Sequence, residues 1–295
     1  MKLFITIFTP TFNRANLLYR LYQSLCNQTF KDFEWIIVND GSKDNTDDVV
    51  QSFLDEGKIK IKYIKQENGG KHRAINRGVR EAKGDFFFIV DADDYLISTA
   101  LKIVSFYAGQ IKDDTSFAGI CGMKCYPDMH RIGGDILFKT IDCTAIDFRN
   151  KYRMKGDVAE ILKTSIFKQY PFPEIKDEKF CPEALVWNTI SFNGLKLRYF
   201  NENIYVAEYI PNGLTSRIDL IRINSPKSAL LTYDITLKNK NKLIFKKWFR
   251  FSVNFWRFYF HCTKEKRQGT ELHSRLLMPL GFIYYLIDKR KYYDK

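Results

Sequence analysis

The sequence contains no apolar run long enough to cross a membrane. Its 295 residues are 45% hydrophobic and 27% charged, yet no apolar stretch reaches the roughly 18–20 residues that a membrane-spanning helix requires. The first residues also lack the basic segment, long apolar segment and small-residue cleavage site of a secretory signal. We therefore expect a globular protein that is neither secreted nor membrane-spanning and that resides in the cytoplasm.

Cysteines are few and scattered, which is typical of reduced thiols in a cytosolic protein. Of the six cysteines, only Cys121 and Cys125 are close in sequence. No second group of Cys or His follows them at the spacing of a zinc site. We expect these thiols to lie in the core rather than to bind metal.

Acidic residues are scarce at the C-terminal end. The chain carries 47 Lys and Arg against 34 Asp and Glu, a net charge of +13, but residues 226–295 hold 16 of the basic side chains and only 5 of the acidic ones. Residues 1–225 are therefore close to neutral. A basic extension of this kind is typical of proteins that bind nucleic acid or an anionic membrane surface.

What the sequence does contain is a regular alternation of strands and helices. Over the first 110 residues, short β-rich apolar runs alternate with segments whose apolar residues recur at helical spacing. The expected strands cover 3–8, 34–38, 58–64 and 86–90, and the expected helices cover 16–27, 44–54, 70–82 and 97–110. Later strands are expected at 117–123, 158–161, 195–200 and 204–210, with a helix at 182–193 and only helices from 226 onwards. This order predicts an α/β fold with a central, mostly parallel sheet and a C-terminal helical extension.

Polar segments follow the first four strands, at the edge where parallel sheets bind ligands. The most apolar strand is followed by Asp91, Asp93 and Asp94. Three neighbouring carboxylates repel one another, and binding of Mg²⁺ or Mn²⁺ would offset that repulsion. The alternative is that Asp93 and Asp94 cap the helix that follows.

Other polar positions carry weaker signals. Asp40 lies in an Asn-Asp-Gly-Ser segment, where its carboxylate accepts hydrogen bonds either from the turn itself or from a base or sugar. Asn68, Gly70 and Lys71 precede a helix whose N-terminus would favour phosphate. Glu183 begins another helix, where a carboxylate is also common because it interacts favourably with the helix dipole.

Together these residues give the chain a resemblance to the family 2 glycosyltransferases, inverting enzymes with the GT-A nucleotide-sugar fold. The segments that match, in the family's order and at its spacing, are residues 9–14, 39–42, 68–84 and 91–94. Residues 176–187 and 209–217 more weakly resemble the acceptor side of bacterial polysaccharide enzymes. The resemblance implies transfer of a sugar from a nucleotide-sugar donor, usually a UDP-sugar, to a saccharide or lipid-linked acceptor in surface polysaccharide synthesis.

The resemblance also implies a division of the chain and a set of site residues. The implied parts are a GT-A domain over 1–225, with its nucleotide-sugar half at 1–110 and its acceptor half at 111–225, and a basic helical extension over 226–295. The residues implied to bind the nucleotide sugar are Pro10, Thr11, Asn13, Arg14, Asp40, Asn68, Gly70, Lys71, Asp91 and Ala92. Thr11 and Asp40 match residues that hold the base. Asp93, together with Asp91, matches the acidic motif that holds Mg²⁺ or Mn²⁺.

For the general base the resemblance points to Glu183. The family commonly has a Glu-Asp pair there, whereas this sequence has Ala184 in the second place. Either Glu183 removes the proton from the acceptor hydroxyl, or a neighbour such as Asp177 or Glu178 does.

Two other functions fit parts of the sequence. A sugar nucleotidyltransferase would also bind a nucleotide and a metal, but it usually has a Gly- and Arg-rich loop after its first strand, and residues 9–14 contain no glycine. A nucleic-acid-binding protein would suit the net charge. Its basic residues should flank the strand ends, whereas here they concentrate in the extension, so we expect no nucleic-acid partner.

One segment of the extension has an amphipathic pattern. Residues 244–261 place Phe245, Trp248, Phe255 and Tyr259 near one helical face and basic side chains toward the other. This pattern predicts an interfacial helix that holds the protein on the inner face of the cytoplasmic membrane. The alternative is that the aromatic face packs within the protein and the basic face is solvated.

Overall fold

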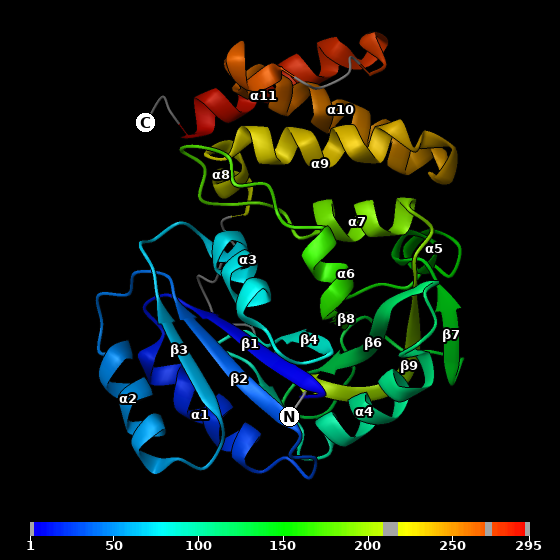
Figure 1. Cartoon of the computed structure of the whole chain (residues 1–295). Coiled ribbons are helices and arrows are strands. Elements are labelled where there is room, and N and C mark those ends of the chain that lie inside the picture. Colours follow the sequence, from blue (N-terminus) through cyan, green and yellow to red (C-terminus); the bar gives the residue numbers. More distant parts are fainter. Residues whose placement is uncertain (1–2, 209–217, 269–272, 293–295) are drawn as a thin grey trace. The chain divides into compact units, whose positions relative to one another are not determined.

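The computed structural model describes residues 3–208, 218–268 and 273–292, which fall into two compact units (Figure 1). The first unit comprises residues 1–171 and 193–209, and the second comprises residues 172–192 and 210–295.

The first unit is built on one mixed sheet. Its strands are β1 (Ile5–Thr11), β2 (Phe33–Asn39), β3 (Ile61–Lys65), β4 (Phe86–Ile89), β5 (Tyr95–Leu96), β6 (Phe117–Cys125), β7 (Thr140–Cys143), β8 (Val158–Lys163) and β9 (Lys196–Val206). The order is β3-β2-β1-β4-β8-β6-β9-β5, with β7 beside β9. The strands from β3 to β4 are all parallel, as the alternation of strands and helices predicts. Beyond β4 the sheet is mixed: β8 is antiparallel to both β4 and β6, β6 pairs with β9 in parallel, and β5 and β7 are antiparallel to β9.

Helices cover both faces of this sheet. They are α1 (Ala15–Cys26), α2 (Thr46–Glu56), α3 (Lys71–Glu81), α4 (Ala100–Ile111), α5 (Ala145–Asn150) and α6 (Thr164–Gln169). Strand residues two apart point to the same face. Ile5 and Ile7 therefore join the core that contains α1, α2 and α4, whereas Phe8 faces Gly78 of α3, where an added Cβ would lie 2.2 Å from the Phe8 ring.

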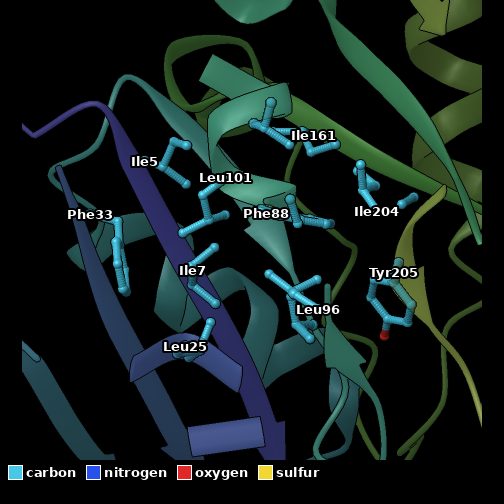
Figure 2. Close-up of a cluster of buried hydrophobic side chains, with 14 of the residues drawn as sticks. Ile5, Ile7, Leu25, Phe33, Phe88, Leu96, Leu101, Ile161, Ile204 and Tyr205 are labelled. Atoms are coloured by element: carbon cyan, nitrogen blue, oxygen red, sulfur yellow. The ribbon is translucent and has the colours of Figure 1, made fainter. Parts of the chain in front are cut away.

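The main core extends across both halves of the sheet (Figure 2). Ile5 and Ile7 of β1 and Phe88 of β4 lie in one buried cluster with Ile161 of β8 and Ile204 of β9. All seven residues of β2 are buried. The parallel strands β1, β2 and β4 are largely buried because helices cover both faces of the sheet. This is the usual pattern for the middle of a parallel sheet.

The two strands expected at 195–200 and 204–210 are a single strand over their described part, β9. The polar residues Asn201, Glu202 and Asn203 suggest a turn in the sequence, but they lie where the pairing of β9 with β6 shifts register. A bulge of this kind lets a strand continue past residues that break its apolar pattern.

The second unit is helical. Its described residues form α7 (Ala184–Phe192), α8 (Ile218–Ile223), α9 (Pro226–Lys238), α10 (Phe245–His261), α11 (Met278–Tyr292) and three short 3₁₀ segments. The expected C-terminal helices are therefore confirmed over the described residues. None of the helices in the described ranges has the length and apolar content needed to cross a bilayer.

The boundary between the units differs from the one expected at residue 225, because 172–192 belongs with the C-terminal helices. The carboxylate of Glu178 accepts hydrogen bonds from the backbone N–H groups of Lys227 and Ser228 at 2.8 and 2.9 Å, at the start of α9. Asn188 of α7 donates to the Thr236 hydroxyl of α9 at 3.1 Å. These bonds attach the segment to α9.

The interfacial face expected on residues 244–261 is wrong for most of α10. Phe255, Trp256 and Phe258 are buried with Leu230 and Leu237 of α9. These three aromatic residues of α10 therefore form part of the core of the helical unit, as the packing alternative proposed, whereas Phe245 and Phe249 near the start of α10 are exposed.

Candidate active site

The carboxyl ends of β1, β2 and β4 lie at one edge of the sheet. Thr11 pairs with Asn39 in the register of β1 and β2, and the N–H of Val90 donates to the Phe8 carbonyl at 2.8 Å. This register brings together most of the residues expected to bind the donor. They are Pro10, Thr11, Asp40, Asn68, Gly70, Lys71, Asp91, Ala92 and Asp93.

The carboxylate of Asp40 is buried and anchors the loop before α3. It accepts hydrogen bonds from the N–H groups of Gly69 and Gly70 at 2.9 and 2.7 Å and from the side chain of Gln66 at 2.7 Å. The side-chain amide of Asn68 donates to the same carboxylate at 3.2 Å. Gly70 has φ 97°, a conformation that glycine adopts without steric cost. Asp40 thus fixes the backbone that leads to the N-terminus of α3.

Lys71, the first residue of α3, pairs with Asp91. Its ammonium nitrogen lies 2.7 Å from Oδ1 and 3.0 Å from Oδ2 of Asp91. Burial raises the pKa of Asp91, but the charges of Lys71 and Lys124 outweigh it, so that the pKa is lowered. The pair therefore places a fixed cation and a fixed anion at the strand edge, next to the N–H groups of a helix N-terminus, which favour phosphate.

The other two carboxylates of the acidic motif differ in their surroundings. Asp94 is buried and accepts hydrogen bonds from the Tyr205 hydroxyl at 2.6 Å and the Glu208 N–H at 3.1 Å. Burial and the charge of Asp91 raise the pKa of Asp94 to about 6. The same two causes raise the pKa of Asp93, whose carboxylate has no hydrogen bond or ion pair with another residue in the described part of the chain.

The helix-cap interpretation of these carboxylates is wrong. The helix that follows, α4, begins at Ala100 and its N-cap position is Thr99. The short strand β5 separates the acidic motif from it. Asp93 and Asp94 therefore do not satisfy the N–H groups of α4.

Asn13 connects the end of β1 to the segment after β2. Its N–H donates to the Ser42 hydroxyl at 2.9 Å, and its side-chain oxygen accepts from the Lys43 N–H at 2.8 Å. Arg14 is close enough for its charge to offset part of the rise in the pKa of Asp93. The Thr11 hydroxyl is buried and has no hydrogen-bond partner among the described residues, so a ligand group could use it.

Sequence reasoning missed three residues of this site. The buried Tyr205 of β9 donates to Asp94, and its hydroxyl oxygen accepts from the Asp91 N–H at 3.0 Å. The Lys124 ammonium of β6 lies 4.1 Å from the centre of the Tyr205 ring. Arg20 of α1 donates to the Asp93 carbonyl. These residues come from distant elements and belong to no local motif, so no sequence signal could have found them.

The residues present fit a divalent cation of the magnesium type. In the ranges that the structure describes, no group of three or more His, Cys, Asp or Glu side chains could hold a metal. Mg²⁺ and Mn²⁺ commonly bind through one or two carboxylates, with substrate phosphates and water as the other ligands. Asp93, with an open carboxylate and Asp91 as an anionic neighbour, matches that pattern.

The residues considered for the general base lie in the second unit. Glu183 directly precedes α7, and its carbonyl accepts from the N–H groups of Val186 and Trp187 at 3.0 and 3.2 Å. Glu178 is buried, and its carboxylate accepts hydrogen bonds from N–H groups at the start of α9. These contacts indicate a structural role for Glu178. Residues 209–217, the weaker part of the resemblance, lie outside the described residues.

The thiols of Cys121 and Cys125 are buried and unpaired by disulfides, and burial raises the pKa of both. The expectation that they are core thiols is confirmed.

Comparison with known sequences gives a family match and several relatives. Residues 6–120 match the profile of Glycosyl transferase family 2. The chain is similar to glycosyltransferase GlyA of Streptococcus pneumoniae, at 28% identity over 225 residues, which cover 72% of this chain and 32% of GlyA. It is also similar to the Campylobacter jejuni GalNAc(5)-diNAcBac-PP-undecaprenol beta-1,3-glucosyltransferase, at 28% identity over 236 residues, which cover 78% of this chain and 70% of that protein. The chain spans about a third of the length of GlyA, the first of these two relatives.

Solved structures share the fold. S. aureus TarS 1–349 superposes with a TM-score of 0.61 at 17% identity, over 96% of this chain and 80% of that one. The same TarS fragment has been solved with UDP, and it then superposes with a TM-score of 0.57 at 18% identity, over 99% and 92% of the two chains. Mannosyltransferase PcManGT from Pyrobaculum calidifontis, solved with GDP-Man and Mn²⁺, has a TM-score of 0.60 at 14% identity, over 97% of this chain and 87% of that one. These likenesses confirm the expected GT-A fold.

Proposed function

We propose that the chain, whose residues 6–120 match the profile of Glycosyl transferase family 2, transfers a sugar, with inversion, from a nucleotide-sugar donor to a saccharide or lipid-linked acceptor in surface polysaccharide synthesis. The observation that carries this proposal is the strand edge at which the Asp40-anchored loop, the Lys71–Asp91 pair and the open carboxylate of Asp93 meet. A donor diphosphate needs such a combination of backbone N–H groups, a cation and a carboxylate for its counter-ion.

The donor we propose is a UDP-sugar. The structural neighbour TarS was solved with UDP and with UDP-GlcNAc, whereas PcManGT was solved with GDP-Man. In this chain the buried Thr11 hydroxyl, which lacks a hydrogen-bond partner among the described residues, would bond the base. The Asp40 carboxylate, which accepts hydrogen bonds from the loop before α3, would position that loop beside the base.

The other site residues have distinct proposed roles in the transfer. The loop at Gly70 and the ammonium group of Lys71 bind the diphosphate and offset charge as it leaves. Asp93 and Asp91 would hold Mg²⁺ or Mn²⁺, which when bound supplies Lewis-acid stabilisation of the leaving group. Glu183 removes the proton from the acceptor hydroxyl as it attacks the anomeric carbon, a contribution of roughly 10²–10⁴-fold in rate.

For the acceptor and location we propose a lipid-linked saccharide at the inner face of the cytoplasmic membrane. The Campylobacter relative is named for an undecaprenol-linked saccharide. The basic C-terminal helices of this chain suit an anionic surface. The protein would then be a peripheral membrane protein that meets its acceptor at the bilayer.

A donor panel tests this proposal. The purified chain is incubated with UDP-, GDP-, dTDP- and CMP-sugars, with and without Mn²⁺, and the released nucleotide is quantified. We expect release of UDP from one or a few UDP-sugars, dependent on the metal. Cleavage of no sugar nucleotide under any condition, by a chain that is folded by circular dichroism, would overturn the proposal.

A further inference from the structure

Helix α11 has a buried side that is fixed by specific contacts with α10. Gly281 approaches α10 so closely that an added Cβ would lie 2.3 Å from the Cβ of Trp256. The buried carboxylate of Asp288 receives two hydrogen bonds of 2.6 Å from the Arg257 guanidinium and lies 2.9 Å from the His261 ring nitrogen. These contacts determine which side of α11 faces outward.

The opposite side of α11 is apolar and exposed. Leu280, Ile283 and Ile287 recur at intervals of three and four residues, so they form one stripe along the helix, and they are 40%, 52% and 52% exposed. Other exposed apolar side chains widen or lengthen the stripe: Leu276, Met278, Phe282, Tyr284 and Leu286. An apolar surface of this extent is unusual on a soluble monomer and marks a site of interaction.

The charges that α11 and the turn before it expose are all positive over residues 273–292. The one acidic side chain of α11, Asp288, is buried and paired with Arg257 and His261. Arg275 is exposed just before the helix, and Lys289, Arg290 and Lys291 are exposed in its last turns. A helix with a broad apolar side and flanking cations has the character of an interfacial segment that binds anionic lipid.

We propose that the outer face of α11, defined by Leu276, Leu280, Ile283, Ile287 and the basic residues at its two ends, docks on an anionic bilayer surface. The apolar side chains would enter the boundary between headgroups and acyl chains, while Lys289, Arg290 and Lys291 contact anionic headgroups. This rests on the membrane partner proposed above and assigns it to α11 rather than to α10, whose central aromatic residues Phe255, Trp256 and Phe258 are buried.

A second copy of the chain suits this surface less well. Helix pairs bury a narrow seam, whereas the exposed apolar residues of α11 spread from Phe282 to Tyr284 over roughly 200° of the helix surface at 100° per residue. An antiparallel partner helix would also bring Arg275 of one copy next to Lys289–Lys291 of the other, and like charges repel. Anionic lipid instead complements every exposed charge of this face.

Vesicle co-sedimentation tests the proposal on the full chain. Vesicles of pure phosphatidylcholine and vesicles with 40% phosphatidylglycerol are compared at 50 and 500 mM salt. The apolar variant carries Ile283→Ser and Ile287→Ser. Its matched control is Phe106→Ser, which removes an exposed apolar side chain from α4, 62% exposed, in the first unit.

A second variant removes charge without touching the apolar stripe. It carries Lys289→Gln, Arg290→Gln and Lys291→Gln, and its control carries the same change at three exposed lysines of the first unit: Lys102, Lys155 and Lys196. Because all six side chains are exposed, these variants should fold even if the apolar variant does not. Thermal melting of each variant checks this directly.

We expect the wild-type chain to bind the anionic vesicles at 50 mM salt, with binding at least about tenfold weaker in both α11 variants and unchanged in both controls. Absence of binding by the wild-type chain, or equal binding by the charge variant and its control, would overturn the proposal. So would a concentration-dependent dimer in light scattering that Ile283→Ser and Ile287→Ser abolish, because it would assign the face to a second copy. Release of nucleotide from soluble donor, measured in the same samples, reports separately on the proposed transferase activity.

Discussion

Replacement of Tyr205 by Phe removes one hydroxyl group that holds two parts of the acidic motif. The hydroxyl donates to the Asp94 carboxylate at 2.6 Å and accepts from the Asp91 N–H at 3.0 Å. All other contacts of the buried ring are retained. The substitution therefore tests whether the acidic motif depends on a residue that lies far from it in sequence.

The expected cost follows from these two bonds. A hydrogen bond to a charged group contributes about 1.5–3 kcal/mol, and a buried N–H left without a partner costs about 1–3 kcal/mol. Asp94 keeps its bond from the Glu208 N–H, so we expect a loss of roughly 2–4 kcal/mol in the free energy of unfolding. The hydroxyl holds residues 91–94, which include Asp91 and Asp93. Turnover should therefore fall about 10–100-fold, as is usual when a group that orients metal ligands is removed.

The assay combines urea unfolding with steady-state release of UDP. The matched control is Tyr107→Phe, which removes another buried tyrosine hydroxyl, 3.0 Å from the Glu202 carboxylate and on α4, away from the acidic motif. We expect the control to lose stability and keep its turnover number. If Tyr205→Phe also keeps its turnover number, the idea that Tyr205 positions the acidic motif is refuted, whatever its stability.

Three further substitutions test other parts of the account. Asp93→Asn should lower turnover by roughly 10²–10³-fold while the melting temperature is kept, because an amide is a poorer ligand for a divalent cation; full activity of the wild-type chain in EDTA would contradict this. Glu183→Gln should lower turnover by about 10²-fold or more with donor affinity unchanged, and near-normal turnover would assign the base to another residue. Asp288→Asn should destabilise the chain by about 3 kcal/mol at pH 7, because it leaves Arg257 and His261 without their buried carboxylate. Burial raises the pKa of Asp288, but its bonds from His261 and Arg257 outweigh that effect and lower it, so the stability it contributes is present above roughly pH 4 and is lost as the pH falls further; denaturation curves of both proteins at pH 3–7 should therefore converge at the acidic end.

The sequence was sufficient to predict the parallel part of the sheet and its ligand edge. In that part β1, β2 and β4 are largely buried, and β1, β2 and β3 are each followed by a helix, so local pattern and long-range topology agree. Asp40, Lys71 and Asp91 each follow a predicted strand, and the parallel register brings them to one edge. Their positions were therefore predictable, although the bonds from Asp40 to the loop were not.

The rest could not be predicted because it depends on contacts between distant segments. Tyr205 reaches Asp94 only because β9 continues through a bulge, and the sequence suggested two strands there. The aromatic residues of α10 have a helical period that fits a membrane surface and a helix core equally well. Only the packing of α9 against them decides between the two, and that packing leaves α11 with the exposed face.

The central claim is that the chain cleaves a nucleotide sugar by direct displacement at the anomeric carbon. Proton NMR of the sugar released to water, in the first minutes before its anomers equilibrate, measures this without knowledge of the acceptor. From an α-linked UDP-sugar with Mn²⁺, the account predicts that UDP and the β-anomer appear first, and that Asp93→Asn forms neither at a comparable rate. First appearance of the α-anomer, or no consumption of any UDP-sugar by the folded wild-type chain, would contradict it.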